Sequence, residues 1–295
     1  MSDRLFLIAQ RLLPKQSLTT LSGRLASLQA GARTTALIRR FIARYRVDMS
    51  EAAEPNPARY ASFNDFFTRA LKPGVRPLAD APYVCPVDGA ISQCGAIVGD
   101  RIFQAKGHHY TTRALLGGDA AQAALYQGGS FATIYLSPRD YHRIHMPCDG
   151  RLLSMRHIPG SLYSVNPATA RGVPGLFARN ERVVCEFEQP QGGRRFVVVL
   201  VGATIVGSMA TVWHGVVNPP RSRRVREWRY DDRDIVLARG AEMGRFLLGS
   251  TVVLLFPADT LRFEPAWQAG KAVRMGEAMG QPIEQRPTPK PDSTA

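Results

Sequence analysis

Acidic residues are scarce in this 295-residue sequence, which has 24 Asp and Glu against 38 Lys and Arg and a formal charge of +14. Such a surface attracts polyanions, among them nucleic acid, anionic lipid headgroups and acidic substrates. Cysteines are also few, and Cys85, Cys94, Cys148 and Cys185 form neither a CxxC pair nor a zinc or disulfide framework. They are expected to be reduced thiols of a cytosolic protein.

Long uninterrupted apolar runs are lacking as well. The apolar stretch between Arg4 and Arg11 is too short for the core of a signal peptide. Residues 196–213 ("FVVVLVGATIVGSMATVW") carry no charge over about the length of a short spanning helix. Gly202 and Gly207 interrupt this segment, which is rich in β-branched residues. The pattern therefore favours two buried strands over a transmembrane helix.

Basic amphipathic helices are predicted in residues 1–50, where apolar residues recur at helical spacing. This segment contains nine basic residues and only two acidic ones. In "TALIRRFIARYRV", one face carries Leu37, Ile38, Phe41, Ile42 and Tyr45, and arginines surround it. Such helices suit the headgroup region of an anionic membrane. They equally suit a helix packed on its own core with a solvated arginine face, and periodicity alone does not separate the two.

The remainder of the chain is mostly β in texture, with short β-branched runs between Gly, Pro and Asp turns. A short helix is expected in "ASFNDFFTRA" and one helix over residues 114–126. The prediction is an α+β fold with a predominantly β-sheet core, sandwich-like or barrel-like, and N-terminal amphipathic helices. Three regions are expected: a basic helical membrane-association region (1–55), a catalytic β-rich domain (56–285) and a Pro-rich disordered tail (286–295).

Two polar clusters in the β region could carry chemistry. Asp88 precedes Gly89 in "CPVDGAIS", which by itself is also an ordinary turn pair. His142, His145 and Cys148 follow one another at intervals of three, a spacing that on a helix could hold a metal. Pro138 and Pro147 argue instead for a strand leading into a loop. We therefore favour acid–base histidines over metal ligands and expect no metal site.

The run "GRFLLGSTVVLLF" (244–256) places Gly249, Ser250 and Thr251 inside an otherwise apolar strand-like segment. Glycine rarely enters a strand interior without a reason. Ser250 could be a plain turn serine, or a nucleophile activated by a histidine that a carboxylate orients. Asp88, His145 and Ser250 would supply these three parts. The GxSxG elbow of serine hydrolases is absent, because position 252 is valine.

Several blocks together resemble the phosphatidylserine decarboxylase proenzymes. They are "FNDFFTR" (63–69), "PVDG" (86–89), "YLSPRDYHRIHMP" (135–147), "LFARNERV" (176–183), "VGATIVGSM" with "TVW" (201–213) and "LGST" (248–251) preceded by "GAEMGRF". They occur in the family's order and cover residues from about 60 to 280. The N-terminal helices agree with the family in character more than in motif.

The resemblance implies that Ser250 attacks the carbonyl of Gly249 and that the chain is cut between them into a β chain (1–249) and an α chain (250–295). The former serine would become a pyruvoyl group at the new N-terminus. His145 matches the base of this reaction and Asp88 its orienting carboxylate. The pyruvoyl group would form a Schiff base with phosphatidylserine and release CO2 and phosphatidylethanolamine. His142 is the candidate for proton handling in this second reaction.

A lipid substrate also favours the membrane interpretation of residues 1–55. The expected partners are phosphatidylserine and an anionic membrane surface, with the protein peripheral on the cytoplasmic side of the inner membrane. The α and β chains would form a heterodimer, and homodimerisation is a further family expectation. Two alternatives remain: a serine hydrolase that uses Asp88, His145 and Ser250 without chain cleavage, and a non-catalytic membrane-binding or nucleic-acid-binding β domain. Nucleic acid is disfavoured, because aromatic and basic residues do not interleave in a recognisable RNA-binding motif.

Overall fold

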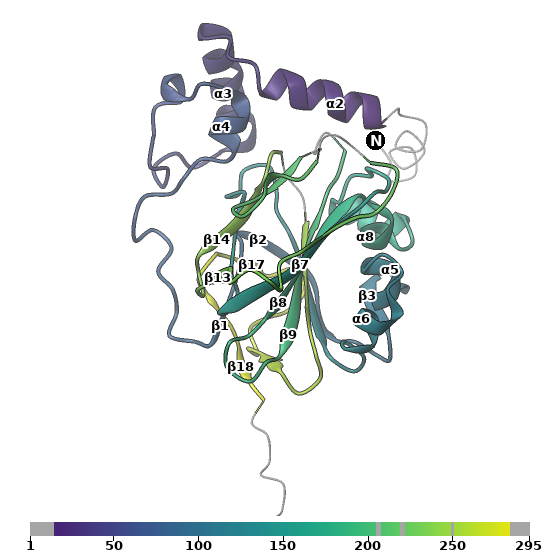
Figure 1. Cartoon of the computed structure of the whole chain (residues 1–295). Coiled ribbons are helices and arrows are strands. Elements are labelled where there is room, and N and C mark those ends of the chain that lie inside the picture. The colour runs from purple at the N-terminus through teal and green to yellow at the C-terminus, as the bar shows by residue number, and fades with distance from the viewer. Residues whose placement is uncertain (1–14, 205–207, 219–221, 249–250, 284–295) are drawn as a thin grey trace, which may run out of the picture.

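The computed structural model describes residues 15–204, 208–218, 222–248 and 251–283. Strands dominate this part of the chain, and helices gather at one end of the sheets and along one side of them (Figure 1). The predicted α+β fold with a β-sheet core is therefore confirmed. The expected tail (286–295) lies outside the described residues.

A nine-stranded antiparallel sheet forms the centre of the molecule. Its strands in spatial order are β12 (Arg226–Arg229), β7 (Gly150–Ile158), β8 (Arg182–Glu188), β9 (Arg195–Val201), β15 (Thr251–Phe256), β5 (Ser130–Tyr135), β2 (Gly89–Ala96) and β17 (Ala272–Val273), and β13 (Val236–Leu237) also pairs with β7. Among the described strands the two ends of this sheet do not pair with each other, so it is not closed into a barrel.

Three smaller sheets complete the β structure. A four-stranded sheet has the order β11 (Gly215–Val216), β10 (Met209–Thr211), β14 (Glu242–Phe246) and β6 (Arg143–His145). A three-stranded sheet contains β1 (Tyr83–Val84), β18 (Ala278–Pro282) and β16 (Leu261–Phe263), and a hairpin joins β3 (Arg101–Ala105) to β4 (His108–Thr111).

Strand β15 shows how the large sheet is buried on both faces. Val252 and Leu254 belong to a core cluster that includes residues of the four-stranded and three-stranded sheets, such as Phe246. Val253 and Leu255, which point to the other face, belong to a second cluster shared with the helices. Successive side chains of a strand point to opposite faces of the sheet. Since each face of β15 packs on an apolar cluster, apolar residues are favoured at successive positions along it. This explains why the run "TVVLLF" contains no charge.

The helices lie in two groups (Figure 1). At one end are α2 (Lys15–Ala26), α3 (Ala32–Tyr45), the 3-10 helix η1 (Pro57–Arg59) and α4 (Phe63–Phe67). Along the sheet are α5 (Thr112–Leu115), α6 (Ala120–Ala124), α7 (Pro167–Gly172) and α8 (Leu176–Arg179). The predicted helices are confirmed from residue 15 onward and at "FNDFF", and residues 1–14 lie outside the described part of the chain.

The single helix expected over residues 114–126 is wrong. The segment forms α5 and α6 instead, and Gly117 and Gly118 between them have φ values of 84° and 101°. Glycine adopts this left-handed backbone region without a Cβ clash, so the chain turns there rather than continuing as a helix.

The uncharged segment 196–213 contributes to two strands, β9 and β10, as the sequence predicted. Five of the seven β9 residues are valine or leucine in the middle of the nine-stranded sheet, flanked by β8 and β15. In the described ranges, no helix is both long enough and apolar enough to cross a bilayer.

Candidate active site

Gly249 and Ser250 lie outside the described residues, but the chain on each side of them is defined. The four-stranded sheet holds the chain up to Phe246, and the nine-stranded sheet receives it again at Thr251, which pairs with Tyr135 on β5 and Val201 on β9. Leu248 has a φ of 93°. A non-glycine residue pays an energetic cost in this region of backbone space, and such strain concentrates at functional sites. The strain lies one residue before the predicted cleavage position.

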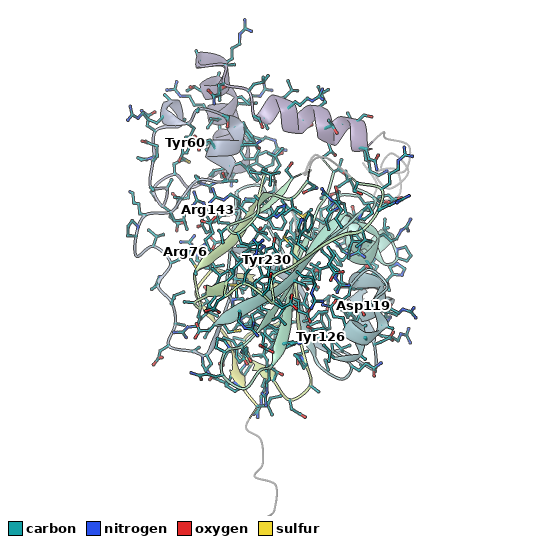
Figure 2. All side chains as sticks on the ribbon, viewed as in Figure 1. Tyr60, Arg76, Asp119, Tyr126, Arg143 and Tyr230 are labelled. Carbon is teal, nitrogen blue, oxygen red and sulfur yellow. The ribbon has the colours of Figure 1, made fainter. Side chains whose placement is uncertain are left out.

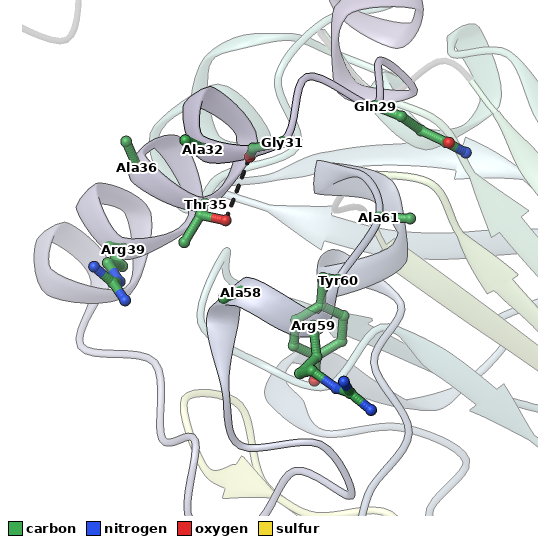
Figure 3. A pocket seen from close by; sticks show the side chains of 10 residues that line it. All are labelled: Gln29, Gly31, Ala32, Thr35, Ala36, Arg39, Ala58, Arg59, Tyr60 and Ala61. Carbon is green, nitrogen blue, oxygen red and sulfur yellow. Dashed lines mark hydrogen bonds between the residues drawn. The ribbon is translucent and has the colours of Figure 1, made fainter.

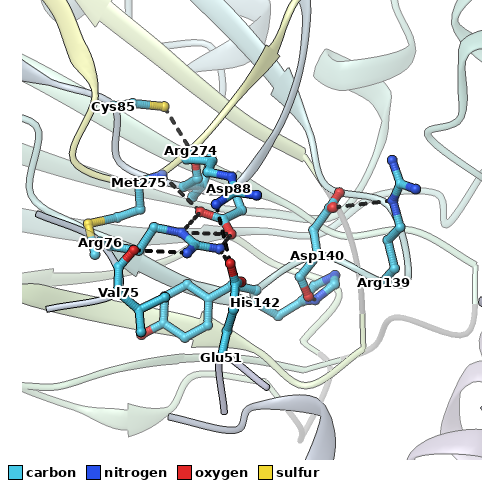
Figure 4. A network of polar contacts seen from close by, with 12 residues as sticks. Glu51, Val75, Arg76, Cys85, Asp88, Arg139, Asp140, His142, Arg274 and Met275 are labelled. Carbon is cyan, nitrogen blue, oxygen red and sulfur yellow. Dashed lines mark hydrogen bonds and ion pairs between the residues drawn. The ribbon is translucent and has the colours of Figure 1, made fainter. Parts of the chain in front are cut away.

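Asp88 is held from two sides just before β2. Arg76 donates from Nε to Oδ1 at 3.0 Å and from Nη2 to Oδ2 at 2.6 Å, and the backbone N–H of Met275 donates to Oδ1 at 2.8 Å (Figure 4). The Nη2 group of Arg76 also reaches Glu51 at 2.7 Å. Burial opposes the charge of Arg76, but its hydrogen bonds to Asp88 and Glu51 outweigh that effect and raise its pKa. Asp88 is thus locked in an ion pair.

Gly89 permits the approach of β2 to β5 beside this carboxylate. A Cβ at this position would lie 2.4 Å from the carbonyl oxygen of Tyr135, which is closer than such atoms approach. The Asp–Gly pair in "PVDG" is therefore more than a turn. Its glycine brings the strand edge against β5 while its aspartate faces Arg76.

His145 ends the short strand β6, which confirms a strand and loop rather than a helix for this motif. Its Nδ1 lies 2.8 Å from the carbonyl oxygen of Gly240, and its Nε2 lies 3.0 Å from the hydroxyl of Tyr141. A carbonyl oxygen only accepts, so Nδ1 carries the proton and Nε2 accepts from Tyr141. Both ring nitrogens have partners, and neither is Asp88. The direct Asp88–His145 hydrogen bond implied by the resemblance is not formed in this structure, because Arg76 and Met275 occupy the carboxylate.

The surroundings keep His145 uncharged near neutral pH. Burial lowers the pKa of the imidazole, while the Gly240 hydrogen bond and the nearby Glu242 carboxylate act against burial and Arg143 acts with it. Burial also raises the pKa of Tyr141 to about 12, so the phenol keeps its proton. A neutral imidazole beside a neutral phenol is a suitable form for accepting a proton.

His142 is fully buried, and its ring packs on Phe67 of α4 with centroids 4.1 Å apart. Nδ1 donates to the backbone carbonyl of Asp140 at 2.8 Å. Nε2 is buried and has no hydrogen-bond partner among the described residues. Burial lowers the pKa of His142 to about 3; the Asp140 hydrogen bond opposes the shift, and the charge of Arg69 adds to it. The ring thus presents an unused acceptor.

An apolar pocket of about 490 Å3 lies between the N-terminal helices and the chain around Tyr135 and Leu248. Its wall includes Leu25 of α2, Leu37 and Phe41 of α3, Phe67 of α4 and the strained Leu248. Phe67 therefore contacts His142 and also borders the pocket. The volume lies in the range of small-molecule sites, about 300–1,000 Å3, and such sites are mainly apolar with a few polar groups.

A polar cavity of about 640 Å3 lies on the Asp88 side, and Asp88, Tyr141 and Arg69 line it. Tyr135 borders both this cavity and the apolar pocket. In the overall view, Arg76 and Arg143 lie toward one side of the sheet core, and Asp119 lies toward the other with helices α5 and α6 (Figure 2).

A third hollow, of about 900 Å3, lies between α3 and η1 (Figure 3). Small residues such as Ala32, Ala36 and Ala58 line it together with Arg39 and Arg59. None of the predicted site residues borders this hollow, and its lining offers no acid–base pair.

Sequence reasoning missed four groups that the structure places around the predicted residues: Arg76, Tyr141, the Gly240 carbonyl and Arg69. Tyr141 and Arg69 stand within the motifs "YHRIH" and "FFTR", so their position in those blocks was a signal. Arg76 lies in a Pro-rich connector, and a backbone carbonyl has no sequence signature. Only the fold could reveal these two.

Comparison with known proteins agrees with these observations. The family model described as "Phosphatidylserine decarboxylase" matches residues 63–281, and a second model, described as "PSD", matches residues 5–46. The phosphatidylserine decarboxylase proenzyme of Methylibium petroleiphilum is 71% identical over 279 residues, covering 95% of this chain and 98% of the relative. That of Chromobacterium violaceum is 70% identical over 279 residues, covering 95% and 99%. That of Azoarcus sp. is 68% identical over 280 residues, covering 95% and 96%. This chain therefore belongs to the phosphatidylserine decarboxylase family.

Proposed function

We propose that this chain is a proenzyme that cuts itself between Gly249 and Ser250 and then converts phosphatidylserine to phosphatidylethanolamine and CO2. The observation that supports this most directly is the strained Leu248 at the crossing between the two sheets, next to the predicted cleavage position. The names of the relatives point the same way. The comparisons give no support to a serine hydrolase that leaves the chain intact.

In the cleavage step, the Ser250 hydroxyl would attack the Gly249 carbonyl carbon, and an ester would replace the peptide bond. Loss of the α-proton of residue 250 then eliminates the ester, so Gly249 leaves as a carboxylate and residue 250 becomes dehydroalanine. Water hydrolyses this to a pyruvoyl group with loss of ammonia. The backbone strain at Leu248 is relieved when the chain is cut, which favours the forward direction.

His145 would serve this reaction as the base. Its Nδ1–H donates to the Gly240 carbonyl, which leaves Nε2, the nitrogen beside the Tyr141 hydroxyl, as the proton acceptor. Asp88 makes no hydrogen bond to His145 but would act on it through its negative charge, which raises the pKa of the imidazole and so favours its protonated form. The role of Asp88 is therefore electrostatic support combined with the Arg76 ion pair, rather than a direct hold on the tautomer.

The residues around the site fit a pyruvoyl group derived from Ser250. A pyruvoyl carbonyl supplies an electron sink for loss of CO2 from an amino acid. His142 offers the buried acceptor Nε2 beside the Phe67 wall of the apolar pocket. At neutral pH it is uncharged, so it delivers a proton only after gaining one. A bound anionic headgroup would raise its pKa and make that possible.

The α and β chains would stay together after cleavage. Strand β15, at the start of the α chain, lies between β5 and β9 of the β chain, and all six of its residues are buried. Strands β17 and β18 of the α chain also pair with β2 and β1 of the β chain. The product is thus expected to be an α–β heterodimer.

The N-terminal helices would hold the protein on an anionic membrane at the cytoplasmic face. Leu21 and Leu25 lie one helical turn apart on α2, Leu28 follows just after the end of this helix, and all three are more than half exposed. Exposed arginines occupy α3, among them Arg40 and Arg44. Apolar side chains with arginines around them match a negatively charged bilayer surface. The apolar pocket opens among the same helices and would receive the acyl part of the lipid.

The direct test is an assay of purified protein with vesicles that contain phosphatidylserine. We expect phosphatidylethanolamine and CO2 in equal amounts from the native protein, and neither from Ser250→Ala. Native protein that has been cut and still yields no phosphatidylethanolamine would refute the proposed function.

A further inference from the structure

Arg69 is a buried guanidinium with unused hydrogen-bond donors. It follows α4, is 5% exposed, and its Nη2 donates to the backbone carbonyl of Arg139 at 3.1 Å. Nε and Nη1 are buried and have no hydrogen-bond partner among the described residues. Burial lowers the pKa of Arg69, yet a guanidinium stays charged in proteins. A buried cation without an anion is costly, so an anionic partner is expected at this position.

The neighbouring carboxylates are already engaged. Arg76 binds both Asp88 and Glu51, and Arg143 forms an ion pair with Glu242 at 2.9 Å. Asp140 accepts from the backbone N–H of Ser137 at 2.7 Å. In the described part of the chain, no carboxylate lies within ion-pair distance of Arg69. The other two arginines are thus neutralised by carboxylates, whereas the described contacts of Arg69 are the Arg139 carbonyl and the ring of Phe66, 5.5 Å from its centroid.

The surroundings of Arg69 connect it to the candidate site. Its side chain lines the polar cavity of about 640 Å3 together with Asp88 and Tyr141. Its charge also acts on His142. Tyr135 lines both this cavity and the apolar pocket. A ligand with apolar chains and an anionic headgroup could therefore place one part on each side of Tyr135.

We infer that Arg69 binds the phosphodiester of the phospholipid headgroup, an inference that rests on the proposed function. The headgroup of phosphatidylserine offers two anions, the phosphodiester and the carboxylate. An ion pair with the carboxylate would stabilise the ground state and slow the loss of CO2. The phosphodiester keeps its charge throughout the reaction, so an ion pair with it stabilises the ground state and the transition state alike and does not slow the loss of CO2. Arginine donates charge-assisted hydrogen bonds to phosphate oxygens.

The test compares substrate and product with the same short acyl chains, which keeps both lipids monomeric. Phosphatidylethanolamine retains the phosphodiester and lacks the carboxylate. With Arg69→Gln we expect the KM for dihexanoyl phosphatidylserine and the inhibition constant of dihexanoyl phosphatidylethanolamine to rise together, by about 10- to 100-fold. The kcat should change much less, and intact mass should still show two chains.

Other outcomes would overturn the inference. A rise in KM with an unchanged inhibition constant for the product would assign Arg69 to the carboxylate. Unchanged values for both lipids would give Arg69 a purely structural role. If inorganic phosphate binds the native protein at Arg69 while both lipid constants stay unchanged in the variant, the site serves free phosphate. Absence of activity in native, cut protein would refute the proposed function instead, so the two failures are distinguishable.

Two further variants make the result interpretable. Arg69→Lys keeps the charge but has fewer hydrogen-bond donors, so the KM for phosphatidylserine and the inhibition constant of phosphatidylethanolamine should both rise, but less than with glutamine. If Arg69→Gln does not fold, the lysine variant is compared with the native protein in the same way. Arg59→Gln removes an equal charge from an arginine whose side chain is 74% exposed. It should leave both constants unchanged, and a similar rise there would mean that overall charge, and not Arg69, sets the affinity.

Discussion

Arg76 binds the Asp88 carboxylate side-on, with Nε and Nη2 donating to its two oxygens and Nη2 also reaching Glu51. Side chains of both residues are nearly buried, with exposed fractions of 6% for Arg76 and 10% for Asp88. This ion pair takes the place of the expected contact between Asp88 and His145. Its removal would leave a buried carboxylate that, among the described residues, accepts from the backbone N–H of Met275 alone.

Replacement of Arg76 by glutamine is expected to lower the free energy of unfolding by about 3 kcal/mol, because breaking one side of a buried pair leaves an uncompensated charge. Urea unfolding of uncut Ser250→Ala protein would measure this without chain dissociation. The matched control is Arg229→Gln, whose partner Asp231 lies on the surface, with side chains 65% and 49% exposed. Its effect should be much smaller, because solvent screens a surface pair. Equal effects at the two sites would contradict the importance of the Asp88 pair.

Tyr141→Phe is expected to slow self-cleavage about fivefold. The hydroxyl donates to Nε2 of His145, and a neutral hydrogen bond that fixes a ring is worth about 1 kcal/mol. The fraction of cut chain is followed by gel electrophoresis after refolding the uncut protein. Tyr126→Phe serves as the control, because its buried hydroxyl has no partner in the described structure. An unchanged or faster rate in Tyr141→Phe would show that the hydroxyl does not position the base.

Stability should fall as the pH drops below about 6.5 because of His142. The pKa of this residue is about 3 in the folded protein and about 6.5 in the unfolded chain, so between these values the unfolded state binds more protons. The free energy of unfolding then decreases by about 1 kcal/mol per pH unit as the pH falls through that window. His142→Gln in the uncut Ser250→Ala background should flatten this dependence. An identical slope in both proteins would show that the pKa of His142 does not differ between the folded and unfolded states, and would contradict its buried, uncharged state.

Membrane binding should depend on the exposed leucines in and just after helix α2. Leu21 and Leu28 are 56% and 54% exposed and do not line the apolar pocket. Changing both to serine removes about 3 kcal/mol of apolar burial, so affinity for anionic vesicles should fall about 100-fold. Co-sedimentation measures this, and Leu125→Ser, at a 43% exposed position after α6, should bind normally. Equal binding by all three proteins would contradict the interfacial role of the helices.

Much of the fold was accessible from the sequence because its signals are local. The β-branched runs predicted strands such as β9 and β15, and apolar spacing predicted α2 and α3. Sheet closure was not accessible, because it depends on which distant strands pair. The interruption at Gly117 and Gly118 was missed because the apolar pattern around it suits one helix. Its φ values show that the turn requires glycine.

The candidate site was predictable in its residue types but less so in its contacts. The resemblance named Asp88, His142 and His145; in the structure Asp88 lines the polar cavity with Tyr141, the hydroxyl of Tyr141 contacts His145, and His142 packs on Phe67 at the apolar pocket. The tautomer of His145 depends on the carbonyl of Gly240, some 95 residues further along the chain. The partner of Asp88 is a connector arginine. Such contacts between distant segments leave no periodic trace in the sequence.

The central claim is that the chain cuts itself at one bond and makes its own reactive group. Intact mass spectrometry of purified native protein tests it most directly. We expect two polypeptides, residues 1–249 ending in Gly249 and residues 250–295 beginning with a pyruvoyl group, and only the uncut chain from Ser250→Ala. A single full-length native species that persists on prolonged incubation would contradict the account.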